Sequence, residues 1–333
     1  MSNPSPSPFV PPTWPATVFS IASIVILPFY FFVFFSLLRL RYVSKTYNTT
    51  FYTILLQHCI ADLIAMSFYF VIIVARGITF IREFYYEYQE FYIAAAAYNH
   101  IYYTLYIRCS GIVLLSFQRY LVIAHHHSKL TTKVQNAPKL YIIGVYWILP
   151  TLISLVVLKD TNFKYDSFET MAVIAESTVI QRNTLMALIV VSLTCVLCSI
   201  VYGALFIFVR KNTVRLSKSL RRELSLAIQV FILLLAFFAI LVYYSFQNYF
   251  AQTHNTGPIF YMRSIYPMAN GFLSYINPFC IIFLNKDLTK QVIRSLSCKR
   301  FKVSDAQQVS GIISNSAKQQ NQQRKGTTNQ VTF

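Results

Sequence analysis

The chain has 333 residues, of which 56% are hydrophobic and only 12% are charged, and its formal net charge is +18. Seven long apolar stretches account for this composition and leave too little polar surface for a soluble globular domain. Because a bilayer core about 30 Å thick needs about 20 apolar residues of helix, the sequence predicts an all-α, seven-helix membrane protein. The predicted spans, in chain order, are residues 17–38, 51–74, 92–118, 140–158, 184–209, 224–249 and 259–284.

The basic residues predict the orientation of the bundle. Most of the 29 Lys and Arg residues follow the first, third, fifth and seventh spans, and few lie in the other connections. Since Lys and Arg are retained in the cytoplasm, the N-terminus is expected outside and the C-terminal tail inside. The positive charge is therefore interpreted as a topology signal with some attraction to anionic membrane lipid, and no nucleic-acid partner is expected.

The segments around the bundle divide into three parts. Residues 1–16 form a short extracellular N-terminus before the bundle of residues 17–284. Residues 285–298 alternate apolar and basic side chains at helical spacing, which predicts an amphipathic helix on the inner leaflet. Cys298 at its end is a candidate for lipidation, and a free thiol fits equally well. Residues 299–333, rich in Gln, Asn and Ser, are expected to be a disordered cytoplasmic tail.

Two opposite charges lie at the same predicted depth near the middle of the membrane. Asp62 in the second span and Arg108 in the third are each about 17 Å from the inner face at 1.5 Å per residue. An isolated charge at this depth costs at least a few kcal/mol, so the two side chains are expected to pair. A static ion pair and a pair that changes partners between receptor states both remain open.

Two further motifs stand near the inner ends of spans. Gln118, Arg119 and Tyr120 close the third span, where a lone arginine also fits simple contact with lipid phosphates. Asn277 and Pro278 lie in the seventh span. Pro278 lacks an N–H and is expected to kink the helix, while Asn277 can satisfy a freed backbone group or face a polar interior.

The outer half of the bundle is rich in aromatic residues. The candidate ligand pocket is formed by Tyr98, Tyr102 and Tyr106 of the third span, Phe246 and Tyr249 of the sixth, and Arg263 of the seventh. Tyr243, Tyr244, Tyr261 and Tyr266 belong to the same aromatic set. Such stripes also serve packing or interfacial belts, and Arg263 also fits pairing with an outer-loop glutamate. A pocket of this kind would suit a small apolar or acidic molecule.

Together these motifs resemble a known family. The order and spacing of the motifs resemble a rhodopsin-like G-protein-coupled receptor, and more narrowly a nematode serpentine chemosensory receptor of the SRG superfamily, most like class V and then class G. The resemblance covers about residues 17–300 and is carried by LLQHCIADL, SFQRYLVIAHHHSKLT, YWILPTLIS and YINPFCIIFLNKDLTKQV.

The resemblance implies roles for individual residues and partners. Arg119 would contact a heterotrimeric G protein when the sixth helix moves outward, with Tyr120 as the tyrosine of the same motif. Asp62 would belong to a polar core with Asn277 and Pro278. The implied ligand is a small odorant or pheromone-like molecule, and the implied location is the plasma membrane, in a sensory-neuron cilium.

The chain departs from the rhodopsin-like pattern in ways that predict differences. Gln118 replaces the usual acid, so a restraint on Arg119 in the resting state must be a hydrogen bond or come from elsewhere. In rhodopsin-like receptors, the aspartate that Asp62 matches usually lines a sodium-binding polar core. Arg108 puts a fixed cation in that place, which predicts that sodium does not regulate this protein. The sixth span lacks Trp and Pro, and Ile281 stands where the motif of the seventh span has Tyr.

Other function classes are less consistent with the sequence. A channel or transporter would use Asp62 and Arg108 in a polar pathway, and this alternative stays open. A retinal-binding protein would need a lysine in the seventh span, which residues 259–284 lack. No catalytic constellation predicts an enzyme, and no cofactor or metal is expected, since the adjacent histidines 125–127 point in different directions on a helix. The oligomeric state is not predicted.

Overall fold

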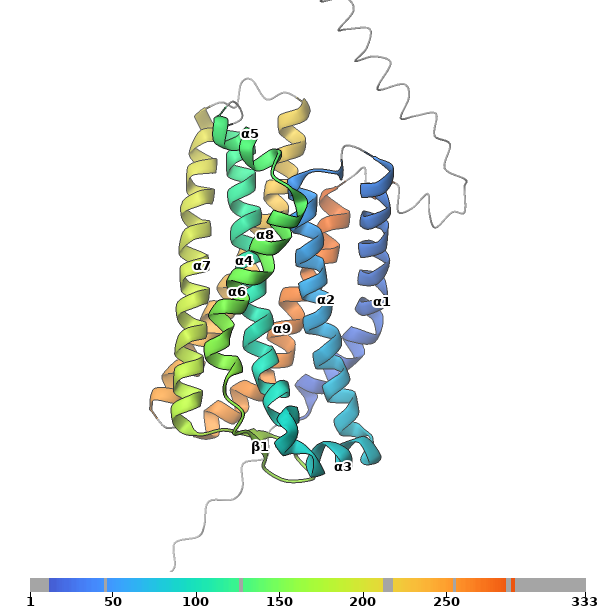
Figure 1. Cartoon of the computed structure of the whole chain (residues 1–333), viewed down its shortest axis with the longest axis vertical. Helices are drawn as coiled ribbons and strands as arrows, with labels where there is room; N and C mark the ends of the chain where they lie inside the picture. Colours follow the sequence, from blue (N-terminus) through green and yellow to red (C-terminus); the bar gives the residue numbers. More distant parts are fainter. Residues whose placement is uncertain are drawn as a thin grey trace, which may run out of the picture. The chain divides into compact units, whose positions relative to one another are not determined.

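The computed structural model describes residues 12–44, 47–125, 128–211, 218–253, 256–285 and 289–290. The elements, in chain order, are α1 (Trp14–Val43), α2 (Thr50–Gly77), α3 (Thr79–Glu87), the π-helical turn η2 (Gln89–Ile93), α4 (Ala94–Ala124), α5 (Lys129–Gln135), α6 (Lys139–Leu158), β1 (Lys164–Tyr165), β2 (Val173–Ile174), α7 (Ser177–Lys211), α8 (Lys218–Gln252) and α9 (Thr256–Leu284) (Figure 1).

Within the described residues, seven helices are long and apolar enough to cross a membrane, namely α1, α2, α4 with its preceding turn, α6, α7, α8 and α9. The predicted all-α, seven-helix fold is therefore confirmed. Most of the helices run several residues beyond the predicted spans, because a helix does not end where its apolar stretch ends. For example, α7 begins at Ser177 rather than near residue 184 and continues to Lys211.

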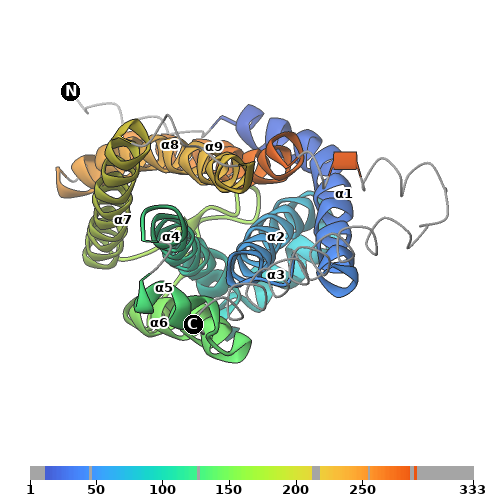
Figure 2. The same cartoon turned by 90° about the horizontal axis from the view of Figure 1, so that it is seen from above.

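The third membrane-spanning helix, α4, lies at the centre of the bundle. It packs against α2, α6, α7 and α8, while α1 packs against α2 and α9 (Figure 2). This position explains why the α4 span combines a low mean hydropathy of 1.4 with the largest buried share, 61%, of the seven. Polar side chains are tolerated in a membrane helix where they face protein rather than lipid. The central helix can therefore carry the buried arginines Arg108 and Arg119.

A glycine permits the close packing of the central helix. A Cβ atom added to Gly111 of α4 would lie 2.5 Å from His58 Nδ1 of α2 and 2.6 Å from the Tyr146 hydroxyl of α6. The His58 and Tyr146 side chains also contact each other, at 3.3 Å. Helices α2, α4 and α6 therefore approach one another closely at Gly111, which has no side chain.

Short connecting elements were not predicted from the sequence. The segment between α6 and α7 forms a two-stranded antiparallel hairpin, in which Lys164 pairs with Ile174 and Tyr165 with Val173. The carboxylate of Asp166 accepts hydrogen bonds from the backbone N–H groups of Ser167 and Ala172, which closes the turn. This outer hairpin, residues 164–174, lies at the end of the bundle that carries α3 (Figure 1).

At the opposite end, the segment after α4 forms the short helix α5. The Ser128 hydroxyl caps it by accepting a hydrogen bond from Thr131 N at 3.0 Å. The Thr50 hydroxyl at the start of α2 donates to the carbonyl oxygens of Val134 and Gln135. These bonds fix α5 against the inner end of α2.

Several predictions fall outside the described residues. They concern most of residues 1–16, most of the amphipathic helix over 285–298, and the tail over 299–333, with Cys298 among them. The seven-helix bundle of residues 17–284 contains the sites that follow.

Candidate functional site

The structure brings Asp62 and Arg108 together in the middle of the bundle. Arg108 Nη1 lies 3.9 Å from Asp62 Oδ1, and both side chains are only 1% exposed. Ser274 of α9 stands between them. Its hydroxyl accepts from Arg108 Nη1 at 2.9 Å and donates to Asp62 Oδ1 at 3.4 Å. The charges are thus linked both directly and through a shared hydroxyl.

Other buried groups complete this polar core. The second carboxylate oxygen of Asp62 accepts from the Tyr30 hydroxyl at 2.8 Å and from Asn277 Nδ2 at 2.9 Å. Arg108 Nη2 donates to the side-chain oxygen of Asn270. Pro278 follows Asn277 inside α9, which continues through it to Leu284. Helices α1, α2, α4 and α9 therefore all contribute to one hydrogen-bonded network.

The sequence analysis did not predict three members of this network, Tyr30, Asn270 and Ser274. Asn270, Ser274 and Asn277 occur at positions i, i+4 and i+7 of α9, which places them on one face of the helix. That spacing was a usable signal for a polar face. Tyr30 had no comparable signal, because it is one aromatic residue among many in α1.

Arg119 lies at the inner end of α4 and is buried, with 2% of its side chain exposed. Its guanidinium forms an ion pair with Glu223 at the start of the apolar part of α8. The same group lies 3.3 Å from the ring centroid of Phe51 in α2. The arginine therefore does not extend to solvent, and it connects α2, α4 and α8.

The side chains beside Arg119 do not replace this partner. Gln118 is 5% exposed, and among the described residues its side-chain oxygen has no hydrogen-bond partner. The Tyr120 hydroxyl lies 3.0 Å from His125 Nε2. The carboxylate that pairs with Arg119 thus belongs to α8, and the neighbouring Gln118 does not take its place. Glu223 itself was not predicted, although it is an acidic residue beside Arg221 and Arg222.

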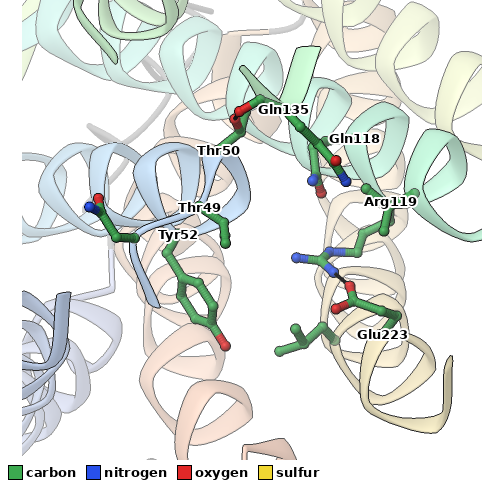
Figure 3. Close-up of a pocket in the computed structure, with 10 residues that line it drawn as sticks. Thr49, Thr50, Tyr52, Gln118, Arg119, Gln135 and Glu223 are labelled. Atoms are coloured by element: carbon green, nitrogen blue, oxygen red, sulfur yellow. Dashed lines mark hydrogen bonds and ion pairs between the residues drawn. The ribbon is translucent and has the colours of Figure 1, made fainter. Parts of the chain in front are cut away.

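A pocket of about 370 Å³ opens at this ion pair. Figure 3 shows Arg119 directed toward Glu223 on one side, with Tyr52 and Thr49 of the α2 end on another. Gln118 and Gln135 close a further side. The pocket is therefore bounded by α2, α4, α5 and α8 at the end of the bundle that the basic loops assign to the cytoplasm.

At the outer end, the tyrosines of α4 are buried inside the bundle. Tyr98, Tyr102 and Tyr106 are 5%, 2% and 1% exposed, and the Tyr98 and Tyr102 hydroxyls lie 3.1 Å apart. Phe163, just before the outer hairpin, packs on Tyr98 with ring centroids 4.7 Å apart. Tyr102 in turn packs near Tyr244 of α8, with ring centroids 6.4 Å apart.

The structure places Phe246 and Tyr249 apart from the buried tyrosines of the predicted pocket. These side chains are 55% and 61% exposed on the outside of α8, whereas Tyr243 and Tyr244 are 7% and 1% exposed and face the bundle. The buried positions of α8 recur at helical spacing, at Ile240, Tyr243, Tyr244 and Gln247, and Phe246 and Tyr249 fall outside this face. The inward face of α8 is the one that carries Tyr243 and Tyr244.

Arg263 of α9 lies beside the α4 tyrosines. Its guanidinium is 5.4 Å from the ring centroid of Tyr98 and 5.8 Å from that of Phe260. Its Nη1 donates to the backbone carbonyl of Val173 in the outer hairpin at 3.0 Å. The alternative of a pairing with an outer-loop glutamate is not seen among the described residues.

The outer hairpin is held by several further contacts. Gln89 accepts a hydrogen bond from Tyr165 N at 2.6 Å, and the Arg76 guanidinium lies 5.7 Å from the Tyr165 ring centroid. Burial raises the pKa of the Tyr165 hydroxyl, and the positive charge of Arg76 opposes this rise. The Arg82 guanidinium lies over the Phe168 ring, with its central carbon 4.6 Å from the ring centroid. The hairpin is thereby fixed near the outer ends of α2 and α4.

Comparison with known proteins assigns the fold to a family. Residues 19–298 match the family described as serpentine type 7TM GPCR chemoreceptor Srv. This match covers well over half of the chain and agrees with the resemblance inferred from the sequence motifs. No curated protein matches the chain.

Proposed function

The chain belongs to the Srv family of serpentine seven-helix chemoreceptors, and we propose that it couples a small-molecule ligand at its outer end to a heterotrimeric G protein at its inner end. The buried ion pair between Arg119 and Glu223 carries this proposal. It joins the central helix to α8 at the mouth of the cytoplasmic pocket. Separation of the pair frees Arg119 for a partner and allows the inner end of α8 to move outward.

The energetics of Arg119 favour a switch rather than a surface anchor. A guanidinium taken out of water is stabilised only while it keeps good partners. Here those partners are the Glu223 carboxylate, whose side chain is 27% exposed, and the face of Phe51. A partner that offers backbone carbonyls or a carboxylate at the inner pocket can substitute for Glu223, which lowers the free-energy cost of separating the ion pair.

The polar core between Asp62 and Arg108 is proposed to connect the two ends. It links α1, α2, α4 and α9 at mid-depth through Tyr30, Ser274 and Asn277. A tilt of α9 at the outer end changes these hydrogen bonds and is passed to α4, which carries Arg119. The channel or transporter alternative gains no support, because both oxygens of Asp62 are occupied by protein donors.

The proposal includes a location and a class of activity. The chain is a multi-pass membrane protein, and its place is proposed to be the plasma membrane of a sensory cell, at the cilium. It is proposed to act as a receptor and not as an enzyme. Membrane lipid around the bundle completes the set of partners.

A signalling assay tests this function. Wild type and Arg119→Ala are expressed at matched surface density, and volatile and acidic small molecules are screened for G-protein activation. A ligand response in wild type that is lost in Arg119→Ala is the expected result. A ligand-gated current that persists without G proteins would instead establish the channel alternative.

A further inference from the structure

Arg263 differs from the arginines of the bundle that pair with carboxylates. Arg108, Arg119 and Arg182 each lie within 4 Å of a carboxylate, on Asp62, Glu223 and Asp160 respectively. Within the described part of the chain, Arg263 has no ion pair. The Arg263 side chain is half-buried, and two of its guanidinium nitrogens are shielded from solvent. A shielded N–H group without a hydrogen-bond partner is costly, so these two nitrogens call for a physical reason.

The unpaired part of the Arg263 guanidinium is one complete edge. Nη1 donates to the Val173 carbonyl, whereas Nε and Nη2 are shielded from solvent and have no hydrogen-bond partner among the described residues. Nε and Nη2 present parallel N–H groups on the same side of the planar group. This is the geometry that binds the two oxygens of one carboxylate.

The acidic residues near the outer end are directed elsewhere. Asp166 accepts hydrogen bonds within its own turn, Glu90 pairs with Lys164, and Asp160 pairs with Arg182. Glu83, Glu87, Glu169 and Glu176 are exposed to solvent. No described carboxylate of this chain therefore neutralises Arg263.

The surroundings of this edge are aromatic. The rings of Tyr98 and Phe260 flank the guanidinium, and Tyr98 continues to Phe163 on one side and to Tyr102 on the other. Aromatic faces bind the apolar body of a small molecule, and tyrosine hydroxyls offer additional donors. A charged head and an apolar body are therefore accommodated by adjacent groups.

We propose that Arg263 is the recognition residue for a small carboxylic acid. The carboxylate is bound by Nε and Nη2, and the apolar part of the acid lies against the Tyr98 and Tyr102 rings. Because Arg263 also holds the Val173 carbonyl, binding of the acid connects α9 to the outer hairpin. This inference rests on the proposed receptor function and specifies the chemistry of its ligand.

Thermal stabilisation of the purified full-length receptor tests the proposal without any G protein. The probes are hexanoate, octanoate and phenylacetate, each compared with its methyl ester, at neutral pH. Wild type is expected to be stabilised by at least one acid and less by the corresponding ester. In Arg263→Gln the half-saturating concentration of that acid is expected to rise on the order of 10- to 100-fold, because a charged hydrogen-bond donor pair is lost.

Two further variants make the result specific. Arg263→Lys keeps the positive charge and a donor for Val173 but loses the paired N–H groups, so it is expected to fold and to bind the acid more weakly. Lys164→Gln removes an exposed positive charge from the same hairpin and is expected to bind the acid as wild type does. Equal stabilisation by acid and ester, an unchanged acid preference in Arg263→Gln, or no stabilisation by any acid would overturn the proposal.

The receptor function and the ligand chemistry can fail separately in these experiments. Arg119→Ala is expected to lose signalling and to keep acid binding, since Arg119 lies at the opposite end of the bundle. A neutral ligand that signals through Arg119 while acids do not bind would overturn only the ligand chemistry. Acid binding without any signalling would overturn only the receptor function.

Discussion

Arg108 and Arg119 lie on the same helix and are both buried, but their carboxylate partners differ in setting. Asp62 is itself 1% exposed and is held by three further side chains, whereas the Glu223 side chain is 27% exposed. Removal of water from both partners raises the cost of separating the pair at mid-membrane. We therefore assign stability mainly to the Arg108 pair and switching mainly to the Arg119 pair.

Loss of one partner in the polar core is expected to be costly. Arg108→Met leaves the Asp62 charge buried without its cation, and about 3–5 kcal/mol of stability is expected to be lost. The double variant Arg108→Met with Asp62→Asn removes both charges and is expected to recover most of this loss. Thermal unfolding of the solubilised receptor measures both, and a double variant no more stable than Arg108→Met would contradict the pairing.

The Arg108 guanidinium also predicts how the receptor responds to sodium. Its Nη1 lies 3.9 Å from Asp62 Oδ1 and already supplies the positive charge of the polar core. The melting temperature is therefore expected to be the same in sodium chloride and in choline chloride at equal ionic strength. A stabilisation specific to sodium would show that the core admits the ion in spite of Arg108.

At the scale of elements, the packing of α4 depends on the missing side chain of Gly111. Gly111→Ala places a methyl group against His58 and Tyr146, and such overpacking is expected to cost about 1–3 kcal/mol. Gly203→Ala on α7 is the matched control, because a Cβ there meets nothing within 4 Å. Gly203→Ala is expected to be neutral or slightly stabilising. Equal melting temperatures for the two variants would contradict the close contact.

The inward and outward faces of α8 are expected to differ in their effect on ligand binding. Tyr244→Ala removes a buried ring that contacts Tyr102, whereas Phe246→Ala removes a ring that is 55% exposed. A ligand response is expected to weaken strongly in Tyr244→Ala and to change little in Phe246→Ala, at matched surface expression. The reverse order would mean that the ligand reaches the bundle from the lipid side of α8.

The elements differ in how well the sequence predicts them. The seven long helices were predictable because a bilayer requires about 20 apolar residues per crossing. The outer hairpin and α5 were not, because their stability comes from contacts with distant residues, such as Thr50 with the α5 carbonyls and Gln89 with Tyr165. Short segments of this kind carry no periodic pattern of their own.

The candidate sites also differ in how well the sequence predicts them. The equal depth of Asp62 and Arg108 could be counted along two helices, so their proximity was predictable. Glu223 is separated from Arg119 by 104 residues, and its position depends on how α8 packs against α4. The exposed position of Phe246 was not predictable for a similar reason, because the rotation of a helix about its axis is set by tertiary packing.

At the scale of the whole molecule, the central helix joins three levels of the bundle. Tyr98 and Tyr102 lie at one end of α4, Arg108 at mid-depth, and Arg119 at the pocket near the other end. All of them belong to α4, which packs against α2, α6, α7 and α8 (Figure 2). A displacement of α4 relative to α8 therefore changes the outer aromatic contacts and the inner ion pair together.

The proposal that the Arg119–Glu223 pair holds the resting state can be tested at Glu223. Its most direct test is the ligand-independent G-protein activation of Glu223→Gln, compared with wild type and with the control Glu87→Gln on the exposed outer end of α3. We expect Glu223→Gln to raise this basal activity about 5-fold or more at equal surface expression, since it weakens the contact that restrains α8. Basal activity of Glu223→Gln equal to that of wild type would show that this ion pair does not hold the resting state.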